Sequence, residues 1–324
     1  MFAAFGHTRG GQGATPSEGD APAAAARRVT AEDCYFFDLR GYLVVPGALG
    51  GDEVRRLNDA IDALPADLRG GDHGHVHRGL TRSAQGRGRP GAPTSMFDWG
   101  PPFRALVGHR ALNPYLADLL GPDFRLDHQY AIFQRGGVGG PANPLHNGGT
   151  PYNPTCTYAV RDGRIYNGLL VVSLAITDVP AGAGGFCCIP GSHKSEFRLP
   201  PGLRETGVGN PVVEQPALSA GDALIFTEAL THGALPWRAA HERRALLFKY
   251  CPGHVQWHPD PVPWDGEWTD TQLRILRPPY ARDRAPSTGT AASFAAFGLR
   301  RLAVGAWRRS QRRFAARRHI DHDG

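Results

Sequence analysis

Between residues 124 and 250 the chain alternates short apolar runs with turns that are rich in glycine and proline. The strongest run, residues 167–177, is apolar over most of its length, as expected of a strand buried on both faces. Short strands separated by turn signals favour an antiparallel sandwich or jelly roll over a helix bundle. The sequence therefore predicts a mainly β fold with flanking helices. Further strands are predicted at residues 41–47, 124–135, 186–189, 212–213, 222–227 and 244–250.

Two helices are predicted ahead of most of these strands. In residues 52–64, apolar side chains repeat at i, i+3, i+7 and i+10 from Val54, which gives the helix one apolar face. Residues 102–120 form a second helical segment that ends before a Gly-Pro pair. Residues 68–97 are rich in glycine, arginine and proline, and they predict a long loop that can cover a site as a lid.

The two ends of the chain differ in composition from its centre. Residues 1–29 are small and polar and predict a disordered arm, residues 30–280 predict one domain, and residues 281–324 form an arginine-rich tail. A terminal helix is predicted at residues 294–318. Eight arginines between residues 300 and 318 allow a phosphate-rich partner, but no nucleic-acid motif accompanies them. A solvated tail is the preferred interpretation.

Cysteine usage and hydropathy bear on the compartment. The five cysteines are an odd number and include no Cys-x-x-Cys pair, which favours reduced thiols over a disulfide framework. No apolar run approaches membrane-spanning length, and the N-terminus lacks the apolar core of a signal peptide. The sequence predicts a cytoplasmic protein without a membrane partner, does not favour nucleic acid, and leaves the oligomeric state open.

Two histidines and an arginine carry the chemistry. His146 stands in Pro-Leu-His-Asn-Gly-Gly, His232 in Glu-Ala-Leu-Thr-His-Gly, and Arg243 follows eleven residues later. Any one of the 14 histidines is more often structural, but a pair at the mouth of a barrel can hold one Fe(II), since neutral imidazole suits that ion. A planar guanidinium at the start of a strand can hold a carboxylate with two parallel hydrogen bonds.

With these residues in place, the chain resembles the phytanoyl-CoA dioxygenase-like family of Fe(II)/2-oxoglutarate enzymes over roughly residues 33–255. The resemblance is carried by Phe37 with Gly41-Tyr42-Leu43-Val44-Val45, by the segment Gly184–Lys194, by His232-Gly233 and by Arg243. It implies a double-stranded β-helix of the jelly-roll, cupin-like kind. It also implies that the cofactors are Fe(II), 2-oxoglutarate and O2.

The resemblance assigns roles to single positions. His146 and His232 correspond to the metal ligands, and Arg243 to the residue that binds the far carboxylate of 2-oxoglutarate. Ser173, on the strongest strand, is a candidate partner for the same co-substrate, although a small core residue is an equal interpretation. Arg244 follows Arg243 on a strand and so points to the opposite face. His193 matches a structural turn of the family and is left out of the site.

The carboxylate that usually lies two residues after the first histidine is absent, because that position is Gly148. In one interpretation Gly148 is a catalytic position that leaves room for chloride on the iron, as in radical halogenases with similar motifs. In a second, Glu228 or Asp162 supplies the third ligand and the enzyme hydroxylates. In a third, the site is degenerate. The first two are weighed about equally.

The sequence does not identify the substrate. A small molecule is expected, with residues 68–97 and 138–163 lining its entrance. Aromatic surfaces are offered by Tyr152, Tyr158 and Trp237; an anionic substrate is one option because of Arg161 and Arg164. Rival hypotheses are a non-catalytic cupin-like binding protein, a nucleic-acid-binding protein acting through its tail, and a zinc hydrolase, although zinc catalysis usually needs three protein ligands.

Overall fold

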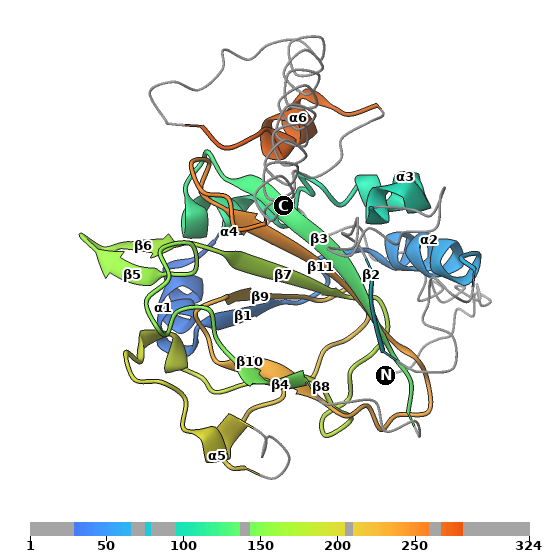
Figure 1. Ribbon diagram of the computed structural model, residues 1–324. Helices are drawn as coiled ribbons and strands as arrows, with labels where there is room; N and C mark the ends of the chain where they lie inside the picture. The colour runs from blue at the N-terminus through green and yellow to red at the C-terminus, as the bar shows by residue number, and fades with distance from the viewer. Residues whose placement is uncertain are drawn as a thin grey trace, which may run out of the picture.

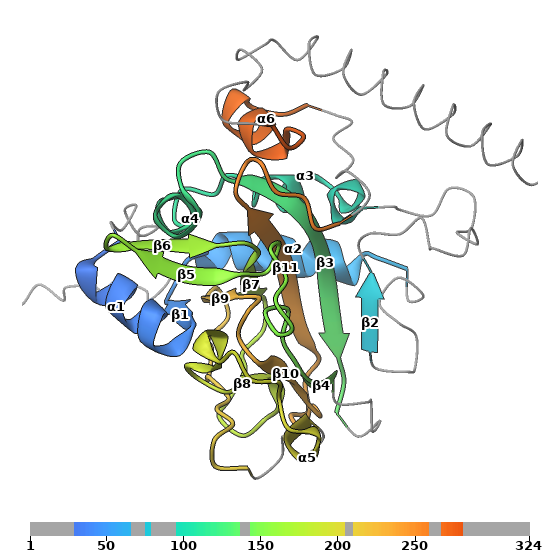
Figure 2. The same cartoon turned by 60° about the vertical axis from the view of Figure 1, so that its left-hand side comes forward.

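The computed structural model describes residues 29–65, 75–78 (backbone only), 95–136, 143–204, 210–258 and 267–280. The predicted disordered arm, most of the predicted loop at 68–97, and the arginine-rich tail with its terminal helix lie outside these ranges. Within them, two antiparallel sheets face each other across the centre of the molecule (Figures 1 and 2). No helix in the described ranges combines the length and the apolar character needed to cross a membrane.

The larger sheet has the strand order β1-β9-β7-β11-β3-β2, and the smaller one has the order β4-β10-β8. A separate hairpin, β5-β6, extends beside them (Figure 2). The large sheet consists of β1 (Tyr42–Val45), β9 (Ala223–Thr227), β7 (Leu170–Ala175), β11 (Arg243–Cys251), β3 (Arg125–Gln134) and β2 (His75–Arg78). The small sheet consists of β4 (Asn143–His146), β10 (His232–Leu235) and β8 (Gly185–Cys188), and the hairpin of β5 (Tyr158–Arg161) and β6 (Arg164–Asn167).

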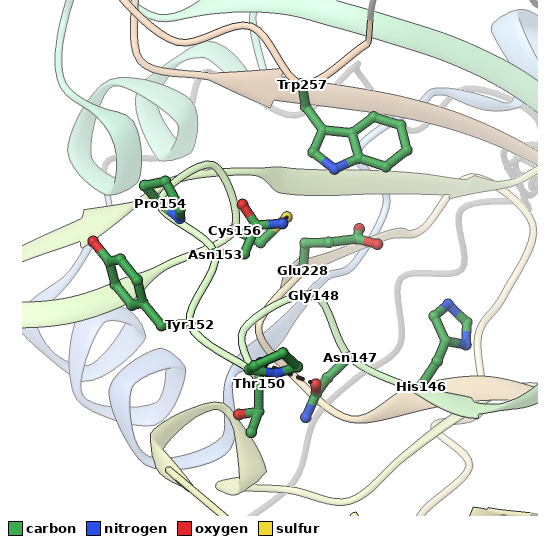
Figure 3. Close-up of a pocket in the computed structure, with 11 residues that line it drawn as sticks. His146, Asn147, Gly148, Thr150, Tyr152, Asn153, Pro154, Cys156, Glu228 and Trp257 are labelled. Atoms are coloured by element: carbon green, nitrogen blue, oxygen red, sulfur yellow. Dashed lines mark hydrogen bonds between the residues drawn. The ribbon is translucent and has the colours of Figure 1, made fainter. Parts of the chain in front are cut away.

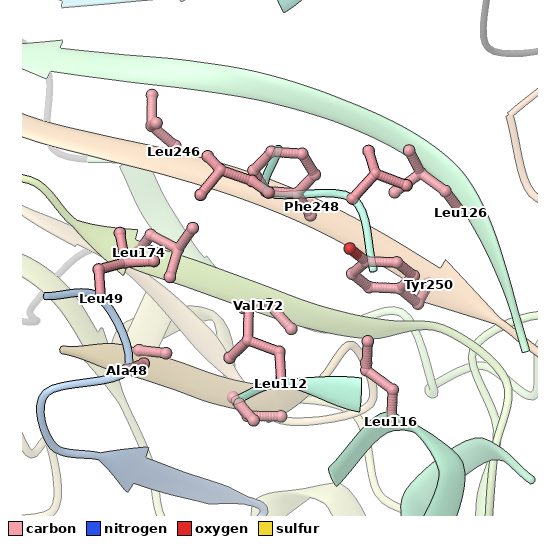
Figure 4. Packing of buried hydrophobic residues seen from close by; sticks show 14 of the residues in the cluster. Ala48, Leu49, Leu112, Leu116, Leu126, Val172, Leu174, Leu246, Phe248 and Tyr250 are labelled. Atoms are coloured by element: carbon pink, nitrogen blue, oxygen red, sulfur yellow. The ribbon is translucent and has the colours of Figure 1, made fainter. Parts of the chain in front are cut away.

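The outer face of the large sheet packs against helices α2 (Gly51–Asp62) and α4 (Asn113–Leu120). Because side chains alternate along a strand, every second residue of β7 and β11 contributes to this main core. Figure 4 shows residues of these strands, among them Val172 and Phe248, in the cluster that also contains Leu112 and Leu116. The strand residues of this face are Leu170, Val172, Leu174, Leu246, Phe248 and Tyr250.

The inner face of the same strands points toward the small sheet. Val171, Ala175, Ala245 and Leu247 belong to a second apolar cluster there. The same alternation places three polar side chains of these strands on this face, and all three are buried: Ser173, Arg243 and Lys249. The space between the sheets therefore combines apolar walls with a few fixed polar groups.

Three local predictions were wrong, and one helix was not predicted. Residues 31–40 form that helix, α1, directly before the strand predicted at 41–47; Thr30 and Asp33 form a capping box that starts it. The single helix at 102–120 is interrupted: α3 (Pro101–Arg104) ends early, and Gly108 has a φ of +74° before α4 begins. Residues 212–213 form a turn, and the 68–97 segment contains strand β2.

One further helix was not predicted. Helix α6 (Asp270–Leu276) begins at another capping box, in which the Thr269 hydroxyl accepts from the backbone of Gln272. The remaining short elements are η3 (Met96–Trp99), η4 (Ser192–Lys194) and α5 (Pro201–Arg204).

Candidate metal centre

Strand pairing brings the two predicted histidines together. His146 ends β4 and His232 begins β10, and their Cα atoms are register partners in the small sheet. The two ring centroids are 4.4 Å apart. Residues separated by 86 positions therefore meet because two short strands pair at their ends.

Each ring is oriented by a backbone carbonyl. His146 Nδ1 lies 2.9 Å from the oxygen of Pro144, and His232 Nδ1 lies 2.7 Å from the oxygen of Leu230. Because a carbonyl only accepts, Nδ1 carries the proton in both rings, and the Nε2 lone pair is left for a ligand. Burial lowers the pKa of His232 to about 4 although Glu228 raises it, so the ring is neutral at neutral pH.

Glu228 joins the two histidines. One ligand atom from each of His146, Glu228 and His232 can be chosen so that all lie within 4.8 Å of one another. No other group of this kind, with three or more candidate ligands, occurs among the described residues. Of the two carboxylates proposed from the sequence, Glu228 is in the group, whereas Asp162 is exposed at the turn between β5 and β6.

Glu228 is charged in this environment. Burial by itself would raise its pKa, but the ammonium of Lys249 and then the ring of His232 lower the pKa to about 2. Lys249 Nζ donates a hydrogen bond to Glu228 Oε2 at 2.9 Å, and Oε1 lies 4.0 Å from His232 Nε2. Two imidazole nitrogens beside an anionic carboxylate form a donor set that fits a divalent transition metal.

Gly148 is enclosed rather than open. Its N–H donates to the backbone oxygen of Glu228 at 2.9 Å. A Cβ at this position would lie 2.8 Å from both Cβ and Sγ of Cys156 and 3.2 Å from Cγ of Glu228. Figure 3 shows Glu228 beside Gly148, with its carboxylate directed toward the side of His146. The space that a side chain at 148 would need is taken by these two residues.

Gly148→Ala is expected to lower the free energy of unfolding by about 1–3 kcal/mol, because the new methyl group overpacks against Cys156. The matched control is Gly202→Ala, since a Cβ at Gly202 meets nothing within 4 Å. Urea unfolding measures both variants. Equal stability of the two would show that the contact with Cys156 relaxes at little cost.

Cys156 was not singled out by sequence reasoning. It is buried, and burial together with the Glu228 carboxylate raises the pKa of its thiol to about 11, so it is uncharged at neutral pH. Nothing in the glycine- and proline-rich segment around it marked it as a neighbour of the site.

Arg243 lies buried on the inner face, and no described residue gives it an anionic partner. Its Nη1 donates to Gln134 Oε1 at 2.6 Å, and its Nε has no hydrogen-bond partner in the described part of the chain. Burial lowers its pKa to about 10, so it keeps its charge at neutral pH. Gly185 makes room for it, because a Cβ there would lie 2.7 Å from Arg243 Nε. A buried, charged and partly unpaired guanidinium is suited to bind a carboxylate.

Two neighbours behave as strand alternation predicts. Arg244 points to the other face, where it pairs with Asp62 and Glu242. Ser173 is buried on the inner face of β7, opposite Leu247 of β11. His193 is bonded to the backbone oxygen of Asp38 and lies outside the metal-ligand group.

A cavity of about 530 Å³ adjoins the metal-ligand group. Tyr152, predicted as a substrate contact, lines it and is 78% exposed, and Trp257 lines the same cavity. Tyr158 and Trp237 do not line it: Tyr158 donates to Asp38, and Trp237 donates to the backbone of His241. The full lining is His146, Asn147, Gly148, Thr150, Pro151, Tyr152, Asn153, Pro154, Cys156, Glu228 and Trp257.

The predicted cationic surface lies elsewhere. Arg161 and Arg164 are exposed on the β5-β6 hairpin, and neither lines the cavity. Within the described residues, the cavity lining contains no lysine or arginine.

Comparison with known proteins agrees with this geometry. A family model described as phytanoyl-CoA dioxygenase matches residues 37–245. The fold is similar to HygX from Streptomyces hygroscopicus, solved with nickel and 2-oxoglutarate bound (TM-score 0.58, 23% identity, 70% of this chain and 89% of HygX covered). It is also similar to SnoK, a non-heme alpha-ketoglutarate-dependent carbocyclase from nogalamycin biosynthesis (TM-score 0.53, 18% identity, 76% and 98% covered).

A third similar structure is AviO1 from Streptomyces viridochromogenes Tue57 (TM-score 0.50, 18% identity, 73% of this chain and 100% of AviO1 covered). The matches to these three structures confirm the predicted jelly roll.

Proposed function

The chain belongs to the phytanoyl-CoA dioxygenase family, and from this premise we propose that it is an Fe(II)/2-oxoglutarate-dependent oxygenase that hydroxylates a C–H bond of a small molecule. The observation that supports this most is the convergence of His146, Glu228 and His232 within 4.8 Å. Two histidines and one carboxylate are the ligand set typical of non-haem Fe(II) oxygenases. When bound, the iron supplies the redox chemistry that joins O2 to the oxidation of 2-oxoglutarate and substrate.

We assign the third ligand to Glu228. Its carboxylate is buried, anionic and adjacent to both imidazoles. Gly148 is the usual carboxylate position of the family, and the surroundings of Gly148 are filled by Glu228 and Cys156. A glutamate from the segment between β9 and β10 thus replaces an aspartate two residues after the first histidine. This arrangement favours hydroxylation over the chlorination that an open position at Gly148 would allow.

The inner face also offers a place for the co-substrate. Arg243 presents a buried charge without an acidic partner in the described residues, as binding of the far carboxylate of 2-oxoglutarate requires. Ser173, on the neighbouring strand of the same face, is the candidate hydroxyl partner. HygX, at 23% identity, has been solved with iron and, in another structure, with nickel and 2-oxoglutarate, which supports the same cofactors here.

The substrate is proposed to enter through the cavity beside Glu228. Its described lining is aromatic, amide and hydroxyl in character, and its charged member Glu228 is already paired with Lys249. This favours an uncharged or cationic small molecule over the anionic one that the hairpin arginines had suggested. HygX has also been solved with hygromycin B bound. A protein of similar fold thus binds a small molecule together with nickel and 2-oxoglutarate.

The test is anaerobic reconstitution with Fe(II) and 2-oxoglutarate, with and without chloride, followed by O2. We expect a visible charge-transfer band on 2-oxoglutarate addition, then formation of succinate. In mass analysis of turned-over candidate substrates, we expect a gain of one oxygen whether or not chloride is present. A chlorinated product would overturn the assignment of Glu228 as third ligand. Absence of both the band and the succinate would favour a non-catalytic binding protein.

A further inference from the structure

Lys249 is a buried lysine that the proposed reaction has not yet used. It lies on the inner face of β11 and is 7% exposed. Its Nζ lies 2.9 Å from Glu228 Oε2, and it faces the rings of Tyr130 and Trp257 at 5.7 and 5.8 Å from their centroids. Burying an unpaired ammonium costs roughly several kcal/mol. Separating Lys249 from the Glu228 carboxylate inside the protein would therefore be costly, so the two groups stay paired.

The sheet fixes this pair. Tyr250 of β11 is paired with Leu170 of β7, and Leu170 is paired with Thr227 at the end of β9. Lys249 precedes Tyr250 in β11, and Glu228 follows Thr227 at the end of β9. The pairing of β11, β7 and β9 therefore places the ammonium of Lys249 close to the carboxylate of Glu228. Burial lowers the pKa of Lys249, but Glu228 and Tyr130 raise it above its ordinary value.

The two oxygens of Glu228 consequently have different surroundings. Oε2 accepts the hydrogen bond from Lys249, whereas Oε1 is the oxygen that lies 4.0 Å from His232 Nε2. We propose that Lys249 is a positioning residue that holds Glu228 by Oε2, so that Oε1 alone is presented to the metal. This inference rests on the proposed function, in which Glu228 is a ligand.

The chemical advantage is a free position on the ion. A carboxylate that binds through both oxygens occupies one position more than a carboxylate that binds through one. An oxygenase of this type needs open positions beside its three protein ligands for co-substrate and O2. By holding Oε2, Lys249 is part of what makes a glutamate at position 228 a workable ligand.

The experiment compares Lys249→Met with Lys194→Met, using Co(II) alone as the metal probe. Lys194 is a matched control because it also pairs with a carboxylate at 2.9 Å, that of Asp38, but at the surface. We expect Lys194→Met to keep the visible Co(II) spectrum and the 2-oxoglutarate affinity of the unaltered protein. Lys249→Met is expected to change the spectrum and to weaken 2-oxoglutarate binding to the Co(II) protein about tenfold. This equals the lower end of the loss in metal affinity or activity that follows removal of a hydrogen-bond partner of a metal ligand.

A Lys249→Met protein with the unaltered spectrum and affinity would overturn the inference. If this variant does not fold, a crystal structure of the unaltered protein with Co(II) decides: Glu228 bound through Oε1, with Oε2 on Lys249, supports it, and ligation through both oxygens refutes it. The Co(II) affinity of Glu228→Gln separates the two proposals. Unchanged affinity there refutes Glu228 as a ligand, whereas a loss there with an unaffected Lys249→Met refutes only the role of Lys249.

Discussion

Glu228→Gln is expected to lower the affinity for Fe(II) or Co(II) by at least about 100-fold. Loss of a group that is only hydrogen-bonded to a metal ligand usually lowers metal affinity by less than this. The substitution removes the anionic oxygen from the group formed with His146 and His232. The amide oxygen of glutamine can still accept from Lys249, but the buried ammonium loses its counter-charge, so the free energy of unfolding is expected to fall by up to about 3–5 kcal/mol. Isothermal titration with Co(II) measures the affinity, and urea unfolding of the apoprotein checks the fold.

The matched control is Asp162→Asn, which makes the same chemical change at the other carboxylate that the sequence offered as a third ligand. Asp162 is exposed and has a φ of 50°, a conformation that asparagine also adopts readily. We expect unchanged metal affinity and unchanged stability. If instead Asp162→Asn lost the metal and Glu228→Gln kept it, the assignment of the third ligand would be reversed.

Arg243→Gln is expected to weaken 2-oxoglutarate binding by about 30-fold or more, since removing one partner of a buried charge pair costs about 2 kcal/mol at the least. In the unaltered protein Arg243 is charged, buried and without an acidic partner in the described residues. Metal affinity should not change, because Arg243 is not a member of the ligand group. Anaerobic titration of the Fe(II) protein with 2-oxoglutarate, followed by its visible band, gives the measurement.

Arg244→Gln provides the control on the opposite face of the same strand. It breaks the pairs with Asp62 and Glu242, so the free energy of unfolding should fall by about 1–3 kcal/mol. Binding of 2-oxoglutarate should remain as in the unaltered protein. Weakened binding in Arg244→Gln and normal binding in Arg243→Gln would show that the wrong arginine has been assigned.

Local sequence signals predicted the buried strands well, because β7 is apolar except at Ser173 and β11 is apolar from Ala245 to Cys251 except at Lys249, so both are recognised without reference to distant residues. Helix α1 was not predicted, although Thr30 and Asp33 have the spacing of a capping box and mark its start in the sequence. The helix predicted at 102–120 runs through Gly108, whose φ of +74° ends regular structure between α3 and α4.

One signal for the site was readable and was not used. Lys249 is the one charged residue inside the otherwise apolar run Ala245–Cys251 of β11. A lysine in a strand buried on both faces needs a partner, so its presence predicted a buried carboxylate nearby. That carboxylate is Glu228, but no spacing rule connects positions 228 and 249.

The sequence by itself determined the family pattern and pointed to the two histidines; the family resemblance chose Arg243, and strand alternation placed Arg244 on the opposite face. Motif order and strand alternation are local properties of the chain. Only the tertiary structure decided that Glu228 and not Asp162 joins the histidines, and that Gly148 is enclosed by Cys156. These contacts depend on how β4, β9, β10 and β11 pair. The pairing of distant strands decides which side chains come into contact. Local sequence periodicity contains no information about that pairing.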